Sequence, residues 1–410
     1  MDQIIKTPAE QDAYKDSMGM LILHRYMSDY TEWGFHCRNK DVKFTPKMVD
    51  MIKEQLKAYC TVKYNEFELD WMAKKMPWLK SDYIAYLRLW HPREEEIFVN
   101  GVSLSGEILK DPMKDENGCG LTIEARGPWL NVSPYEIAIL AIVNEVYFAC
   151  KYGEGAKDDE IKKATDEKIE GVKSGKYDLG SFSEFGLRRR YSGKMQDWIV
   201  GRFKEKETPG FVGTSNVSLA MKYGVKPIGT MAHELGMVLM SHDRYNPSYV
   251  NERIMEAWID EYDTDLGIYL NDLLGEEVFL KDFNRKFAKG FDGLRHDSGD
   301  PFKWGDDMLR KYDELGIDPR TKTLLFSDSL NFEKATKING YFRNRCKVAF
   351  GIGTAIVNPI PDALNIVCKV RRANGVSVCK LSNVQGKTMG ESEEFIKYVQ
   401  ECIGRRLAVK

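Results

Sequence analysis

The sequence predicts an α/β protein: a seven-stranded α/β barrel of the TIM type in the middle of the chain, with α+β segments at both ends. Seven short apolar segments each end in a polar or glycine-rich cluster, and helical patterns lie between most of them. Strands that alternate with helices pair in parallel. Polar clusters after every strand place the expected site at the carboxyl-terminal rim of the barrel.

Composition excludes several classes of protein. The length of 410 residues corresponds to roughly two to three domains. A net charge of -2 and a pI near 6.4 give no overall attraction to nucleic acid or anionic membranes, so we expect neither partner. The eight cysteines form no C-x-x-C pair, and the first residues lack the apolar core of a signal peptide. We therefore expect a cytoplasmic protein.

Residues 1–132 are predicted to form an α+β domain. A helical pattern runs through Met18 to Tyr26, and hairpin strands are expected around the turn Asp115–Gly118. The other expected elements are a strand at Glu32–Cys37, helices at Met48–Tyr59, Glu66–Lys75 and Asp82–Leu89, and the hairpin strands Phe98–Leu104 and Leu121–Ala125.

Residues 133–360 are predicted to form the barrel. A buried helix begins at Ser133, because the apolar stretch Tyr135–Cys150 carries polar residues that a membrane span would avoid. Residues 154–180 predict a solvated connecting helix. The seven segments are Phe185–Arg190, Phe211–Asn216, Ile228–His233, Gly267–Asp272, Phe291–Asp300, Leu324–Ser329 and Val348–Thr354, with helices expected at Glu276–Lys289, Trp304–Leu315 and Phe332–Arg343.

A doubly wound open sheet is the competing topology for this region. We favour the barrel because the polar clusters follow every strand and are not gathered at one switch point. In residues 361–410, a hairpin is expected around Asn374–Gly375, followed by a helix Glu393–Ile403 that Ser392 caps. This tail is expected to return to the first domain.

The residues Lys226–Glu234 place one histidine, His233, after a Gly-Thr turn and before a helical pattern. A lone histidine is more often a packed or surface residue than a catalytic one. His233 gains weight because six other segments repeat the same pattern. Asp272, at another strand end, is expected to orient the histidine by accepting its ring proton. Glu234 is the alternative, or else stabilises the first turn of its helix.

Two loops predict phosphate and sugar binding. Phe350–Thr354 leaves its strand with little side-chain bulk, so backbone N–H groups can approach a phosphate. The pattern is weak alone, but the last strand of a barrel often carries such a site. Gly293–Pro301 gathers carboxylates, a hydroxyl and Arg295, which suit ribose hydroxyls, Mg²⁺ and phosphate. The alternative is an exposed turn whose aspartate caps the helix after Pro301.

Two further clusters follow strands. Ser327–Ser329 offers a hydroxyl and a carboxylate, or else caps the helix that begins at Phe332. Arg188, Arg189 and Arg190 form the main basic cluster of the rim. At least one arginine should point at the site, and we favour Arg188.

These motifs together resemble the nicotinate phosphoribosyltransferase family, in order along nearly the whole chain. Leu187 and Leu235 depart from the pattern, where a threonine and a tryptophan are common, and neither change removes a group assigned to chemistry. The resemblance rests on Asp12–Lys15, Gly127–Trp129, Phe185–Arg190, Phe211–Asn216, Gly229–Glu234, Gly293–Pro301, Phe326–Asp328, Phe350–Thr354, Lys380–Ser382 and Gly386–Thr388.

The resemblance implies that nicotinate and phosphoribosyl pyrophosphate (PRPP) give nicotinate mononucleotide and pyrophosphate, with Mg²⁺ as cofactor and coupling to ATP hydrolysis. It also implies an irregular seven-stranded barrel beside an α/β sandwich domain built from both chain ends. His233 would be phosphorylated by ATP, with Asp272 and Glu234 as its catalytic neighbours. Phe185 and Tyr14 would sandwich the pyridine ring, Tyr14 coming from the second subunit of a homodimer.

By the same resemblance, Arg188 and Arg295 would hold phosphates or the nicotinate carboxylate, and Asp297 would bind ribose hydroxyls. Asp297 and Asp328 would hold the metal. The implied substrate-binding residues are Tyr14, Phe185, Arg188, Thr214, Ser215, Arg295, Asp297, Ser298, Ser327, Asp328, Gly351, Gly353 and Thr354, the last two cradling the 5′-phosphate.

Three alternatives were weighed. Nicotinamide-using relatives place an aspartate where Ser215 stands; an aspartate accepts from an amide and repels a carboxylate, so Ser215 favours nicotinate. Quinolinate transferases lack the phosphorylated histidine. A non-catalytic phosphosugar-binding barrel is disfavoured because His233, Arg295 and Asp297 are all present. The sequence leaves open the oligomeric state and the stoichiometry of ATP coupling.

Overall fold

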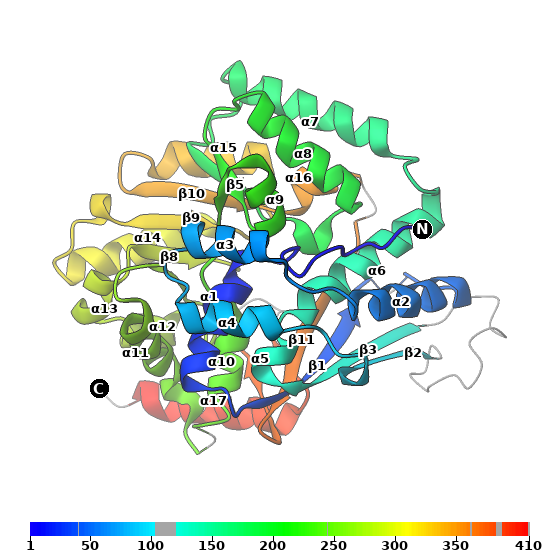
Figure 1. Cartoon of the computed structure of the whole chain (residues 1–410). Helices are drawn as coiled ribbons and strands as arrows, with labels where there is room; N and C mark the ends of the chain where they lie inside the picture. The colour runs from blue at the N-terminus through cyan, green and yellow to red at the C-terminus, as the bar shows by residue number, and fades with distance from the viewer. Residues whose placement is uncertain (40, 103–119, 244, 361–362, 383–387, 409–410) are drawn as a thin grey trace.

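A computed structural model describes residues 1–39, 41–102, 120–243, 245–360, 363–382 and 388–408 (Figure 1). Seven parallel strands form the larger sheet, in the order β6-β5-β4-β10-β9-β8-β7. Their bounds are β4 Ser181–Glu184, β5 Phe211–Thr214, β6 Lys226–Pro227, β7 Ile268–Leu270, β8 Gly293–His296, β9 Thr323–Phe326 and β10 Lys347–Ile352.

The strand order is that of a curled sheet whose first and last strands in the chain are paired. Neighbours in the sheet are neighbours in the chain, except that the first strand, β4, pairs in parallel with the last, β10. The ladder is open between β6 and β7, where the Thr230 hydroxyl donates to the Ile268 carbonyl at 2.8 Å. The sheet is therefore a curled half-barrel, and the competing doubly wound order is not found.

Two of the seven predicted segments begin after their strands have ended. β4 stops at Glu184, so Phe185–Arg190 is the loop after the strand, and β6 is only the two residues before Ile228. Three of the other segments contain their strands in full, and β9 and β10 begin one residue before the last two segments. The prediction of strands followed by polar loops is confirmed, with the boundaries corrected by a few residues.

Helices connect the strands and cover the sheet (Figure 1). One prediction was wrong: Glu276–Lys289 is two helices, because the Asn284 side chain accepts from the backbone N–H groups of Lys286 and Phe287 and starts a new helix. The helices are α7 Asp158–Lys173, α8 Gly193–Glu205, α9 Val217–Tyr223, α10 His233–Leu239, α11 Val250–Tyr262, α12 Glu276–Asp282, α13 Arg285–Gly290, α14 Pro301–Glu314, α15 Phe332–Phe342 and α16 Thr354–Val357.

A second sheet joins the two ends of the chain. Its order is β12-β11-β1-β3-β2, and every pairing is antiparallel. The strands are β1 Tyr30–Cys37, β2 Ile97–Val102, β3 Gly120–Pro128, β11 Ile366–Ala373 and β12 Val376–Ser377. The predicted hairpin of β2 and β3 is confirmed, while its turn at 115–118 lies outside the described residues. Asn374 and Gly375, both with positive φ, form the turn between β11 and β12.

The remaining helices lie mostly in the first third of the chain. They are α1 Ala13–Arg25, α2 Pro46–Tyr59, α3 Glu66–Lys75, α4 Ser81–Leu89, α5 Trp129–Val132 and α6 Tyr135–Tyr152. The run Trp129–Tyr152 is long and apolar enough to cross a membrane, yet 83% of its most apolar window is buried inside the structure. That burial agrees with the prediction of a core helix.

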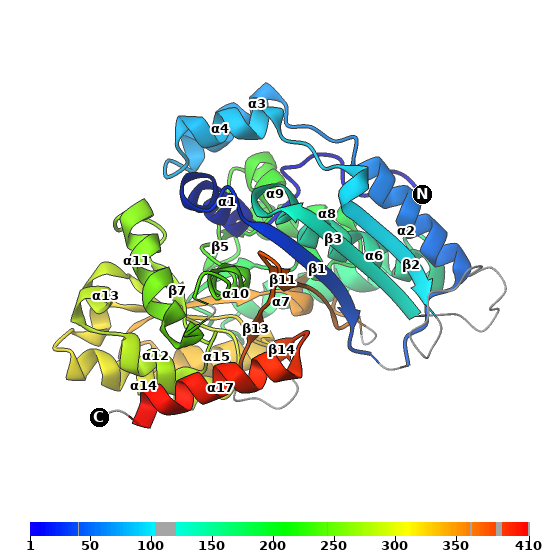
Figure 2. The same cartoon turned by 90° about the horizontal axis from the view of Figure 1, so that it is seen from below.

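The tail ends with β13 Cys379–Lys380, β14 Met389–Gly390 and α17 Glu393–Ala408. The Ser392 hydroxyl accepts from the Phe395 N–H at 3.1 Å, as expected of a cap. The helix α10 contacts β11 of the second sheet and lies between the two sheets (Figure 2). The predicted domain boundaries at 132 and 360 stay a prediction.

Candidate active site

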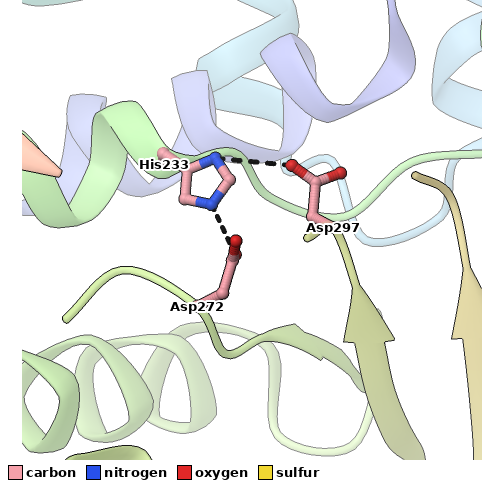
Figure 3. A group of neighbouring side chains, drawn as sticks. All are labelled: His233, Asp272 and Asp297. Atoms are coloured by element: carbon pink, nitrogen blue, oxygen red, sulfur yellow. Dashed lines mark hydrogen bonds and ion pairs between the residues drawn. The ribbon is translucent and has the colours of Figure 1, made fainter. Parts of the chain in front are cut away.

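His233 is the first residue of α10, and its ring lies between two carboxylates (Figure 3). Nε2 is 2.6 Å from Asp272 Oδ1, and Nδ1 is 3.9 Å from Asp297 Oδ2. Asp272 follows β7 and Asp297 follows β8, so two neighbouring strand ends deliver them. The short contact fixes the tautomer: Nε2–H donates to Asp272, which leaves the Nδ1 lone pair facing Asp297.

The charges around this pair favour a neutral histidine. Burial lowers the pKa of His233, and the nearby Lys380 ammonium lowers it further. Burial would raise the pKa of Asp272, but His233 and Lys380 outweigh it and hold this pKa well below its ordinary value. A neutral imidazole beside an ionised carboxylate is the arrangement that makes the free ring nitrogen nucleophilic.

Asp272 is itself held by two further groups. Its Oδ2 accepts from Lys380 Nζ at 2.8 Å and from the Ser298 hydroxyl at 2.8 Å. Lys380 lies in β13, far along the chain, and sequence reasoning gave it no role. The only available signal was its place in the Lys380–Ser382 motif.

Glu234 does not orient His233. Its carboxylate accepts from the Ser133 hydroxyl at 2.5 Å and from Trp129 Nε1 at 3.2 Å, and it forms a buried ion pair with Lys15. The structure thus corrects the assignment of Glu234 as a catalytic neighbour. It is an anchor between α10 and the N-terminal helices.

The two aspartates of the loop after β8 have different roles. Asp300 caps α14 by accepting from the backbone N–H groups of Phe302 and Lys303, as the alternative interpretation predicted for this turn. Asp297 instead faces the site. Its Oδ1 accepts from the Ser327 hydroxyl at 3.1 Å and lies 3.7 Å from Arg295 Nη2.

Arg295 is placed by the loop that carries His233. Its Nη1 donates to the Met231 carbonyl at 3.1 Å, while its buried Nε has no hydrogen-bond partner among the described residues. Burial would raise the pKa of Asp297, but Arg295, His233 and Lys380 together outweigh it and hold this pKa below its ordinary value. The site therefore presents an arginine next to an ionised carboxylate, which suits a phosphorylated sugar.

The three arginines of the rim have separate partners. Arg188 Nε is 3.1 Å from Asp12 Oδ2, and its Nη1 is 3.1 Å from Glu136 Oε1. Arg190 is fully buried against Glu10 and is structural. Arg189 donates to a backbone carbonyl in the tail. Arg188 is the arginine that stands among the predicted site residues, as favoured.

Phe185 lies against two glycines at the end of β10, and Tyr14 lies beside Arg188. A Cβ on Gly351 would lie 2.2 Å from the Phe185 ring, so only glycine fits there. The guanidinium carbon of Arg188 is 5.5 Å from the centre of the Tyr14 ring. Tyr14 thus lies beside an arginine of its own chain. A Cβ on Gly353 would contact the Phe185 carbonyl at 3.0 Å.

Thr214 and Ser215 both donate to buried carboxylates. The Thr214 hydroxyl is 2.6 Å from Glu184 Oε2, and the Ser215 hydroxyl is 2.5 Å from Asp12 Oδ1. Thr214 is fully buried, so this contact is structural. Sequence reasoning gave neither carboxylate a role: Asp12 appeared only within the Asp12–Lys15 motif, and Glu184 was not singled out.

The structure changes the expected metal site. Among the described residues, His233, Asp272 and Asp297 each offer one ligand atom within 4.8 Å of the others, and Asp328 is not in this group. Carboxylate oxygens suit Mg²⁺. Because the Asp272 carboxylate already accepts hydrogen bonds from Lys380 and Ser298, Asp297 is a better candidate than Asp272 for a magnesium ligand.

The alternative role of the Ser327–Ser329 segment is also corrected, since Asn331 caps α15. Thr354 begins the four-residue helix α16 and Gly353 precedes it. Their backbone groups lie at the end of β10, next to the loop that carries Phe185.

Comparisons with known proteins cover the whole chain. The model of the "Nicotinate phosphoribosyltransferase (NAPRTase) family" matches residues 181–404, and that of its N-terminal domain matches residues 10–144. A nicotinate phosphoribosyltransferase of Ralstonia nicotianae is 35% identical over 405 residues, covering 98% of this chain and 99% of its own. One of Acinetobacter baumannii is 38% identical over 409 residues, covering 98% and 97%.

Solved structures give the same result. The nicotinate phosphoribosyltransferase of Porphyromonas gingivalis superposes with a TM-score of 0.88 at 31% identity, over 97% of this chain and 100% of its own. A putative nicotinate phosphoribosyltransferase of Saccharomyces cerevisiae also has a TM-score of 0.88, at 29% identity over 98% and 99%. Each superposition spans nearly all of this chain.

Proposed function

This chain belongs to the nicotinate phosphoribosyltransferase family, and we propose that it couples its reaction to ATP by accepting the γ-phosphoryl group on His233. As an enzyme of this type, it transfers phosphoribosyl from PRPP to nicotinate, giving nicotinate mononucleotide and pyrophosphate in NAD salvage. The observation that carries the proposed coupling is the free Nδ1 of His233, held neutral while Nε2 is bound to Asp272 at 2.6 Å.

In the proposed step, the Nδ1 lone pair attacks the γ-phosphorus of ATP. The N–P bond forms as the bond to the bridging oxygen breaks, and ADP leaves with that electron pair. The Nε2 proton stays on the ring, where Asp272 stabilises the developing positive charge without taking the proton. Water later cleaves the N–P bond, which releases phosphate and restores His233.

A phosphoryl group on His233 would add roughly two negative charges beside Asp272 and Asp297. Lys380, 2.8 Å from Asp272, is a cation that could turn toward that group. Its β13 strand would then be drawn toward α10. This supports a rim that closes when His233 is phosphorylated and reopens when the phosphoryl group is lost.

The transfer itself requires no protein nucleophile. Departure of pyrophosphate from the ribose carbon leaves an oxocarbenium-like centre, which positioned charges stabilise. We assign Asp297 to the ribose hydroxyls, Arg295 to phosphate, and the backbone of Gly353 and Thr354 to the 5′-phosphate. Asp297 would also hold Mg²⁺ when it is bound, and that ion would neutralise charge on the leaving pyrophosphate.

The pyridine ring is assigned to the space beside Phe185 and Tyr14. Arg188 would pair with the carboxylate of nicotinate, and Ser215 would donate a hydrogen bond to it. Nicotinamide is the second candidate substrate, because the Asp12 carboxylate next to Ser215 could accept from an amide.

Three wider features are also proposals. We place the protein in the cytoplasm, where the free thiols of the described cysteines stay reduced. We propose that the half-barrel closes as an irregular barrel beside a sandwich domain from both chain ends. A homodimer stays a prediction.

The coupling is tested with γ-phosphate-labelled ATP. Wild-type enzyme should acquire label that is lost on acid treatment, as expected of phosphohistidine, and His233→Ala should acquire none. The variant should keep slow transfer that ATP does not stimulate. Full ATP stimulation in His233→Ala would remove His233 from the coupling.

A further inference from the structure

Asp12 contacts Ser215 and Arg188, the two residues proposed to bind the nicotinate carboxylate. Its Oδ1 accepts from the Ser215 hydroxyl at 2.5 Å, and its Oδ2 lies 3.1 Å from Arg188 Nε. The residue is 2% exposed. A carboxylate of the protein therefore occupies the position assigned to the carboxylate of the substrate.

Asp12 cannot easily withdraw. The N–H of Ala13 donates to the Ser215 carbonyl at 2.8 Å, and the N–H of Val217 donates to the Gln11 carbonyl at 3.0 Å. Asp12 and Asn216 form an antiparallel bridge between these bonds. The backbone is thus fixed on both sides of Asp12, so its carboxylate stays next to Ser215 and Arg188 unless the side chain itself rotates.

The charges around Asp12 balance without a substrate. Glu136 of α6 pairs with Lys15 of α1, Arg188 and Lys369 of β11, and Glu234 of α10 also pairs with Lys15. Counting only the groups in these direct ion pairs and Asp12, three carboxylates face three cations. A nicotinate anion would leave one buried negative charge in excess, which is costly away from water.

Two further ionisable groups, Tyr14 and Glu184, lie near Asp12. Tyr14 lies on the same helix, and burial raises its pKa well above its ordinary value, so it stays neutral. Glu184 of β4 lies behind Thr214, and burial raises its pKa to about 7. Glu184 is therefore the rival acceptor for any proton taken up in this region.

We propose that Asp12 determines substrate specificity by taking up one proton from solvent when nicotinate binds, and by donating that proton as a hydrogen bond to the nicotinate carboxylate. Arg188 and Ser215 then bind the same carboxylate, and the charge balance is restored. This inference rests on nicotinate being the substrate. An ionised Asp12 would instead accept from the amide of nicotinamide, so the preference for nicotinate should fall as the pH rises.

The ordering of acidities supports Asp12 as the acceptor. Burial raises the pKa of Asp12, although Arg188 and Ser215 oppose it. For Glu136, burial is outweighed by Lys15, Lys369 and Arg188, so its pKa is lowered. Asp12 should therefore be protonated before Glu136.

The test is calorimetric titration of nicotinate into the full enzyme, in buffers of different ionisation enthalpy at one pH. Wild-type enzyme should take up close to one proton per nicotinate bound, and the Kd should rise by up to about tenfold per pH unit above the pKa of Asp12. Asp12→Asn should bind nicotinate without proton uptake. The matched control is Asp16→Asn, another buried carboxyl of α1, which contacts Gln11 and Tyr83 and should leave the uptake unchanged.

Whether nicotinate binding takes up a proton is measured on wild-type enzyme, so this result does not depend on whether the variant folds. Nicotinate binding without proton uptake would overturn the inference while leaving the proposed function intact. Uptake that persists in a folded Asp12→Asn would overturn it too, and would point to Glu184. Failure of wild-type enzyme to bind or convert nicotinate would refute the proposed substrate, and the inference with it.

Discussion

Replacing Lys380 by methionine should shift the pH dependence of His233 phosphorylation to higher pH. Lys380 Nζ lies 2.8 Å from one oxygen of Asp272, and His233 Nε2 lies 2.6 Å from the other. The ammonium and the imidazole are therefore separated by roughly 5–6 Å, which corresponds to about 3 kcal/mol of repulsion at an effective dielectric constant of about 20. Because Lys380 disfavours the imidazolium, its removal raises the pKa of His233.

Removing this repulsion in Lys380→Met should raise the pKa of His233. Only neutral His233 attacks ATP, so the acid limb of the rate profile should move to higher pH. The assay is the initial rate of phosphoenzyme formation from labelled ATP between about pH 5 and about pH 8.5. Lys286→Met, on an exposed lysine, is the control.

An acid limb at the same pH in Lys380→Met and wild-type enzyme would refute this reasoning. It would mean that Lys380 does not act on the charge of His233. A lower rate with an unchanged profile would assign Lys380 to positioning of Asp272 instead.

Three further predictions follow from particular contacts. Gly351→Ala should raise the KM for nicotinate about tenfold or more, because its Cβ would lie 2.2 Å from the Phe185 ring; an unchanged KM would contradict the assignment of that ring. Asp300→Ala should cost about 1 kcal/mol in urea unfolding and leave the KM values unchanged, because Asp300 caps α14. Burial raises the pKa of Asp16 to about 7, so this carboxyl stays protonated in the fold while it ionises in the unfolded chain. The contribution of Asp16 to the free energy of unfolding therefore falls by up to about 4 kcal/mol as the pH rises from about 4 to about 7. Asp16→Asn should then gain in stability over wild type across that range, and parallel unfolding curves at all pH values would contradict it.

Local patterns predicted most of the secondary structure. The Asn374–Gly375 turn, the Ser392 cap and the helix α14 were each predictable because the signals lie within a few residues of one another. The division of Glu276–Lys289 into two helices was not, because the apolar spacing runs through the break that Asn284 causes. The capping of α15 by Asn331 was missed because Ser327–Ser329 offered an equally good local signal.

The site was predictable wherever its residues follow strands. His233, Asp272 and Asp297 meet as their positions at neighbouring strand ends require. Lys380 and Asp12 come from the two ends of the chain, and no periodicity links them to the rim. Long-range contacts of this kind depend on how the two sheets pack, which the spacing of residues does not encode.

The buried charges illustrate the same limit. A sequence gives the number of acids and bases but not their pairing. Glu234 stands next to His233 in the chain, yet it pairs with Lys15 on a different helix. Adjacency in sequence therefore suggested a catalytic neighbour where the fold has a structural anchor.

The most direct test of the account is formation of mononucleotide from PRPP and Mg²⁺ with nicotinate, nicotinamide or quinolinate, each with and without ATP. The account predicts product from nicotinate, stimulated by ATP, and little from the other two. Product from nicotinamide in preference to nicotinate would contradict the roles given to Ser215 and Arg188. Absence of product from all three would contradict the assigned reaction.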